Sequence, residues 1–146
     1  NQGEAMRYLL AGLVAAGLLA APLSAQEDPS PSAEDWQVLE SRAQGIFDLL
    51  KMQNSELAAS LIFEGFGDDT SDKIEDFSVQ LDKMLDSDGQ LQRCEVVRRE
   101  NLGSLMAKLI YACQHTRDIA VWTITFEKPA IGWRLTNVSF STNYEF

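Results

Sequence analysis

The stretch GQLQRCEVVRRENLGSLMAKLIYACQHT, residues 89–116, decides the fold. Before Gly89, apolar residues recur at every third or fourth position, and after it they recur at about every second position. The first period is typical of an amphipathic helix and the second of a half-buried strand. The chain therefore predicts helices before Gly89 and strands after it, which is an α+β fold.

The turn inside this stretch is Gly103-Ser104, because glycine in the first position suits a two-residue hairpin loop. A loop of that length sets the register of the two strands around it. In this register, Arg98 lies on the more apolar face, which is expected to carry the helices. Arg99 lies on the other face, opposite Lys108, as a like-charge pair that the sheet has to tolerate.

Short turns separate the strands that follow, and this predicts an antiparallel meander. In the last strand, the apolar positions change from odd to even numbers near Thr136-Asn137, which predicts a β-bulge and a bent sheet. The expected strands cover residues 91–101, 105–116, 119–127 and 133–142.

Three amphipathic helices precede the sheet. Ser32 and Asp35 have the spacing of a capping box at the start of a long first helix. Asn54 or Ser55 can begin a shorter second helix, and Thr70 or Ser71 a third. The expected ends of these helices are, in order, Lys51, the glycines of residues 65–67, and Asp88-Gly89.

The N-terminal segment has the layout of a secretory signal peptide. An uncharged run over residues 8–21 is followed by small residues up to Ala25. We expect cleavage after Ala25, which makes residues 1–25 a signal peptide with a few upstream residues. The alternative is an uncleaved anchor. Residues 26–32 are expected to be a disordered leader, and residues 33–146 a single α+β domain.

The chain is acidic, with 22 acidic and 12 basic residues and a formal net charge of −10. This charge argues against nucleic acid or an anionic membrane surface as a partner. Together with the export signal, it favours a periplasmic or secreted protein that has no stable membrane insertion after cleavage.

Cys94 and Cys113 are the only two cysteines of the chain. The hairpin register places them face to face, and an exported protein matures where thiols oxidise. We therefore expect a disulfide between them. The alternative is a pair of buried free thiols, because a loop of different length would shift the register.

The order of helices and strands, with the motif GWRLTNVSF at residues 132–140, resembles the nuclear transport factor 2-like superfamily, also called cystatin-like or SnoaL-like. The resemblance implies a cone-shaped domain in which the sheet curls around the helices and leaves a pocket. Members of that superfamily include isomerases, dehydratases, hydrolases, small-molecule binders and catalytically silent partner domains. None of their site positions can be matched residue by residue here, so the fold alone does not select a function.

His115, the only histidine, could form an acid/base site with Tyr111 and Asp118. The favoured alternative is a histidine at the end of a hairpin, in solvent. With one histidine and two paired cysteines, a zinc site lacks ligands, so neither a metal nor a cofactor is expected. The residues expected to line a ligand pocket are Trp36, Phe47, Tyr111, Trp122 and Phe126, with plain core packing as the alternative.

These observations predict a small exported binding or accessory domain that is not catalytic and holds an apolar small molecule in its cone. The alternative is an interaction subunit that forms a homodimer or docks on an envelope protein. A third possibility is a hydrolase or isomerase that uses His115.

Overall fold

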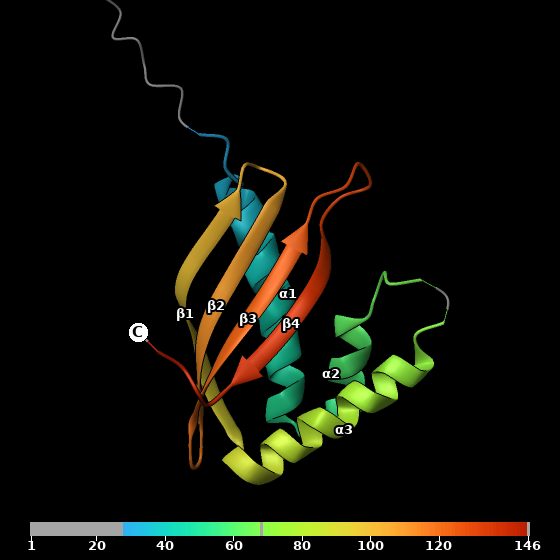
Figure 1. Ribbon diagram of the computed structural model, residues 1–146, viewed down its shortest axis with the longest axis vertical. Coiled ribbons are helices and arrows are strands. Elements are labelled where there is room, and N and C mark those ends of the chain that lie inside the picture. The colour runs from blue at the N-terminus through green and yellow to red at the C-terminus, as the bar shows by residue number, and fades with distance from the viewer. Residues whose placement is uncertain (1–27, 68, 146) are drawn as a thin grey trace, which may run out of the picture.

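The computed structural model describes residues 28–67 and 69–145, and it has three helices followed by a four-stranded antiparallel sheet (Figure 1). This is the predicted α+β class. The predicted signal peptide, residues 1–25, lies outside the described residues. None of the helices in the described part combines the length and apolar character that a bilayer crossing requires. The elements are α1 (Ala33–Lys51), α2 (Ser55–Ile62), α3 (Ser71–Asp88), β1 (Leu91–Leu102), β2 (Met106–His115), β3 (Ile119–Glu127) and β4 (Arg134–Ser141).

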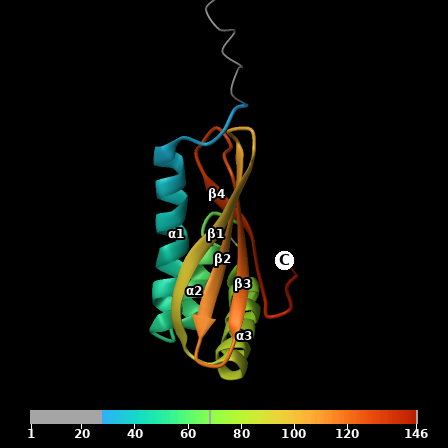
Figure 2. The ribbon, with the colours of Figure 1, turned by 90° about the vertical axis from the view of Figure 1, so that its left-hand side faces the viewer.

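The strands follow one another in the sheet in the order β1-β2-β3-β4, so the sheet is the expected meander. Figure 2 shows α1 along one face of this sheet, with β1 curving beside it. Helix α3 crosses the end of the molecule near β4, where the ring of Phe77 lies 6.1 Å from that of Phe140. The opposite face of the sheet, called the outer face below, carries none of the three helices of the described residues.

The first two helix starts follow the predicted capping, whereas Thr70 begins α3 without a side-chain hydrogen bond to the helix. The Ser32 hydroxyl accepts a hydrogen bond from the Asp35 amide at 3.0 Å, and the Asp35 carboxylate accepts one from the Ser32 amide at 3.1 Å. The side chain of Asn54 caps α2 by accepting from the Leu57 amide at 3.2 Å. Pro31 is buried. The end of the predicted leader is thus already part of the fold.

The first hairpin differs from its predicted register near the loop. Leu102 pairs with Met106, so the loop has three residues instead of two. A β-bulge at Val97 takes up the extra residue, because Val96 and Arg98 pair with consecutive residues of β2. From Val96 to Arg93 the register is the predicted one, and Cys94 pairs with Cys113. A second irregularity follows between Arg93 and Leu91, because Leu91 pairs with His115.

The expected pairing of Arg99 with Lys108 is therefore wrong. Lys108 faces Glu100, and their charged groups lie 3.9 Å apart. Arg99, opposite the buried Leu109, lies on the helix face and forms an ion pair with Glu40 of α1. The bulge replaces a like-charge pair with two attractive contacts.

The bulge predicted in the last strand is confirmed. Thr125 pairs with Asn137 and Phe126 pairs with Leu135, so Thr136 is the extra residue. Its hydroxyl donates to the Thr125 carbonyl at 3.3 Å. The shift turns Val138 and Phe140 toward the helices, where they pack against the core.

Candidate functional site

The chain reversal between α3 and β1 meets the turn between β2 and β3 at one end of the molecule, which we call the hairpin end. His115 is buried there, with 4% of its surface exposed. Its Nδ1 lies 2.9 Å from the Gly89 carbonyl oxygen, and its buried Nε2 has no hydrogen-bond partner in the described part of the chain. The expected solvent-exposed histidine is therefore wrong, because the reversal after α3 covers the ring.

Gly89 makes this close approach feasible. Its φ of +91° is a conformation that residues with a side chain rarely adopt, and a Cβ built on it would lie 2.7 Å from the Cβ of Thr116. The Thr116 amide donates to the Gln90 carbonyl at 3.0 Å. Without a side chain at position 89, the two turns can bond directly through their backbones.

Arg117 closes the C-terminus of α3. Its Nε donates to the Ser87 carbonyl at 3.1 Å, and its terminal nitrogen donates to the Asp86 carbonyl. Its own amide donates to the Asp88 carbonyl at 2.9 Å. These carbonyls have no partners inside the helix, and a cation favours the negative end of the helix dipole.

A polar cavity of about 560 Å³ opens beside these contacts. Its lining includes Asp82 and Asp86, which lie one helical turn apart on α3. No group of three or more metal-ligating side chains occurs among the described residues. The full lining consists of Gln53, Asp82, Leu85, Asp86, Gly89, Gln90, Thr116 and Arg117.

The structure does not assemble the three acid/base candidates into one site. Asp118 is exposed and contacts His115 through its main-chain carbonyl, which accepts from the His115 amide at 2.9 Å. Tyr111 is buried, with its ring 4.9 Å from that of Phe47. Burial, assisted by the charge of Glu40, raises the pKa of the Tyr111 phenol, so this hydroxyl stays protonated.

The five residues expected to line a ligand pocket are placed differently. Phe47 packs edge to face against Tyr111 and Trp122, at 4.9 and 5.4 Å between ring centres, and Phe126 is fully buried in the same core. Trp36 is half-buried, with the Arg99 guanidinium 5.6 Å from its ring. These side chains fill the space between α1 and the sheet, and the cavity at the hairpin end is lined by other residues.

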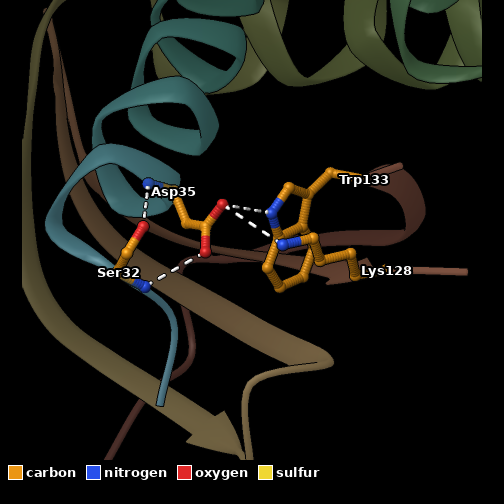
Figure 3. Close-up of polar contacts among 4 residues, drawn as sticks. All are labelled: Ser32, Asp35, Lys128 and Trp133. Atoms are coloured by element: carbon orange, nitrogen blue, oxygen red, sulfur yellow. Dashed lines mark hydrogen bonds and ion pairs between the residues drawn. The ribbon is translucent and has the colours of Figure 1, made fainter. Parts of the chain in front are cut away.

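A polar cluster joins the start of α1 to the loop between β3 and β4, at the end of the molecule that we call the capping end (Figure 3). The Asp35 carboxylate accepts from the Trp133 indole N–H at 3.0 Å and lies 3.6 Å from the Lys128 ammonium. The hydrogen bond from Trp133 is the main cause that lowers the pKa of Asp35 from 3.8 to about 2, and bonds from Ser32 add to it. The cluster holds the start of α1 against the loop between β3 and β4.

Sequence reasoning missed most of the cavity lining. The one available signal was the four-residue spacing of Asp82 and Asp86, which places two carboxylates on one side of a helix. Gln53 and Gln90 come from segments far apart in the sequence, and only the folded chain brings them together.

Comparison with models of known protein families, with curated proteins and with solved structures finds no match. The resemblance to the nuclear transport factor 2-like superfamily therefore stays a prediction.

Proposed function

We propose that this chain is a small exported binding or accessory domain that performs no chemistry of its own. The observation that carries the proposal is the 560 Å³ polar cavity at the hairpin end. Its size is that of small-molecule sites in proteins. Three of the aromatic residues that were expected to hold an apolar ligand, Phe47, Tyr111 and Trp122, are buried against one another, and this favours a ligand outside the core.

The proposed ligand is a small polar molecule with a positive charge. Asp82 and Asp86 supply two carboxylates at the cavity, and Gln53 adds an amide that can donate and accept hydrogen bonds. Arg117, the one cationic side chain of the lining, already donates to two helix carbonyls. The lining therefore attracts a cation such as an amine.

A role without catalysis fits the contacts of the candidate acid/base groups. Nδ1 of His115 is engaged with a backbone carbonyl, and the raised pKa of Tyr111 keeps its proton on the phenol. A general base needs a nitrogen or carboxylate within reach of the substrate, and the other nitrogen of His115, Nε2, is buried. Neither residue lines the cavity.

The proposed location is the periplasm or the exterior of the cell. The disulfide between Cys94 and Cys113 supports it, because such bonds persist mainly in oxidising compartments. The proposed export is tested by measuring the intact mass of the exported protein. Cleavage after Ala25 is expected, and an exported chain that retains residues 8–25 would contradict it.

The ligand proposal is tested by titrating the protein with 1,4-diaminobutane and following backbone amide shifts by NMR. Shifts are expected at Gly89, Gln90 and Thr116, and they should disappear in the double variant Asp82→Asn/Asp86→Asn.

The matched control is Asp72→Asn/Asp76→Asn, which removes the same charge from exposed positions of the same helix. Amide shifts that persist in the cavity variant, or that are lost equally in both variants, would contradict a specific site. So would an absence of shifts in the unmodified protein.

An interaction subunit is the second candidate. It is favoured by β1, an edge strand of 12 residues in which only Leu91 is buried.

A further inference from the structure

We infer that a second copy of this chain pairs antiparallel with the free edge of β1, so that the two sheets join into one continuous sheet. This surface is separate from the proposed ligand cavity. The inference therefore goes beyond the proposed function, and either one can fail without the other.

The free edge of β1 is the first observation. Within residues 28–67 and 69–145, β1 pairs with β2 on one side, and no strand pairs with its other side. Helix α1 covers the face of the sheet and leaves this edge open (Figure 2). A long strand with unpaired N–H and C=O groups is a template for another strand.

The charges on β1 are the second observation. Arg93, Glu95, Arg98 and Glu100 alternate in sign along the strand. Neighbours form ion pairs, at 3.2 Å for Arg93 with Glu95 and 3.0 Å for Arg98 with Glu100. All four side chains are exposed, by 43 to 66%, so they remain accessible to a partner.

The bulge at Val97 puts these four side chains on one face. Arg93 and Glu95 pair with residues of β2 that point to the outer face, and after the bulge so do Arg98 and Glu100. Without the extra residue, the second pair would point to the helices. The outer face of the edge thus carries the uninterrupted series positive, negative, positive, negative.

This series is complementary to itself when it is reversed. In an antiparallel pair centred between Val96 and Val97, Arg93 faces Glu100 of the second copy, and Glu95 faces Arg98 of the second copy. Opposite charges across neighbouring strands attract, whereas like charges repel.

The centre of the proposed pair is apolar. Val96 and Val97 are 38 and 55% exposed, and Val96 of each copy would face Val97 of the other beside the symmetry axis. Both are β-branched residues, which pack well between strands. Burial of this apolar surface adds to the charge attraction.

The sign pattern of the charges favours a second copy as the occupant of the edge. Proteins keep edge strands from pairing with charged side chains, proline, β-bulges or a covering segment. β1 has charges and a bulge, but its charges alternate in sign along four positions, so that a reversed copy presents opposite charges to them. At the other edge of the sheet, Arg134 is the only charged residue of β4. The C-terminal segment, residues 142–145, stands off the outer face on the side opposite α1 (Figure 2).

The test is the molar mass of the full chain in solution, measured by analytical ultracentrifugation from about 1 µM to about 1 mM, because strand-edge pairing buries a small area and is weak. The unmodified chain is expected to reach dimer mass. The variant Glu95→Arg/Glu100→Arg has only positive charges on the outer face of β1, and Arg93→Glu/Arg98→Glu has only negative ones there, because Arg99 lies on the helix face. Each variant alone is expected to stay monomeric, and an equimolar mixture is expected to form a heterodimer.

The matched control exchanges charges elsewhere on the outer face. Glu127→Arg/Arg134→Glu swaps the partners of an ion pair between β3 and β4, and this variant should dimerise like the unmodified chain. A monomer at every concentration of the unmodified chain would overturn the inference. So would dimers of both single-sign variants, because they would show that another surface is used.

A second measurement covers the case in which a charge variant fails to fold. Val97→Cys places a thiol beside the symmetry axis and should crosslink two copies on oxidation. Leu102→Cys places it at the far end of the strand and should not. Equal crosslinking of the two variants would contradict the proposed register.

Discussion

The two ends of the molecule tie a helix terminus to a hairpin by opposite means. At the capping end, the partly exposed carboxylate of Asp35 binds the Trp133 indole N–H and the Lys128 ammonium. At the hairpin end, His115 binds the backbone of Gly89 in a buried contact. The first arrangement depends on a protonation state, and the second depends on shape and backbone conformation. Changes in sequence and in solvent should therefore affect the two ends differently.

Removal of the disulfide should have the largest effect, and it acts near the hairpin end. The bond between Cys94 and Cys113 closes a loop with a sequence separation of 19 residues. Loss of this constraint on the unfolded chain should lower the free energy of unfolding by about 3 kcal/mol. Urea unfolding of Cys94→Ala/Cys113→Ala measures it. An unchanged midpoint would show that the crosslink adds nothing to stability.

Gly89→Ala should have the second largest effect. It should lower the free energy of unfolding by about 2 to 3 kcal/mol, because a residue with a side chain is strained at the φ of +91° that Gly89 adopts. The new Cβ also meets Thr116. The matched control is Gly65→Ala, which has the same φ of +91° but nothing within 4 Å of the added Cβ. The difference between the two variants in thermal unfolding measures the cost of the close approach. Equal losses would mean that Thr116 moves aside freely.

His115→Ala should lower the free energy of unfolding by about 1 to 2 kcal/mol, because it removes the N–H that donates to the buried carbonyl of Gly89. His115→Asn can still place an N–H near the position of Nδ1 and should recover part of the loss. The comparison of the two midpoints in urea separates the hydrogen bond from the volume of the ring. If Asn is no better than Ala, the bond to Gly89 is not what holds this end.

The capping end should respond mainly to pH. The pKa of Asp35 is lowered from 3.8 to about 2, so its stabilisation is complete above pH 3.8 and is lost as the pH falls toward 2. Trp133→Phe removes the main cause and should raise the pKa of Asp35 toward 3.8, as measured by NMR of its carboxyl carbon. Lys128→Met should raise it less, because the ammonium contributes the smallest part. A larger rise in the pKa of Asp35 in Lys128→Met than in Trp133→Phe would contradict the assignment of Trp133 as the main cause.

The capping end also shows how far the sequence could predict the structure. The capping box of Ser32 and Asp35 was predictable, because both partners lie within one turn of the chain. The bond from Asp35 to Trp133 was not, because it joins residues 98 positions apart. Local rules give helix starts and turn residues, whereas contacts between distant segments depend on how the sheet curves.

The first hairpin shows the same limit within one element. Cys94 was predicted to face Cys113 from a two-residue loop, and it does so although the loop has three residues. The loop and the bulge at Val97 each add one residue, and the two shifts cancel. Glycine and serine favour a turn without fixing its length, and a pattern of exposed residues does not reveal a bulge.

The burial of His115 was predicted incorrectly for a related reason. A histidine beside a turn is usually exposed, and the covering segment here is the chain reversal at Gly89, 26 positions earlier. The candidate cavity could not be found from the sequence either, because its lining comes from the ends of separate elements.

The different environments of the three tryptophans give the protein its own optical probes. Trp122 is fully buried, so its fluorescence should follow global unfolding. The indole of Trp133 is bonded to Asp35, so its emission should follow acid titration while the core stays intact. Trp36 lies beside the guanidinium of Arg99 and should respond to changes where α1 meets β1. Chains that retain a single tryptophan would therefore let each part of the fold be observed separately, without an added label.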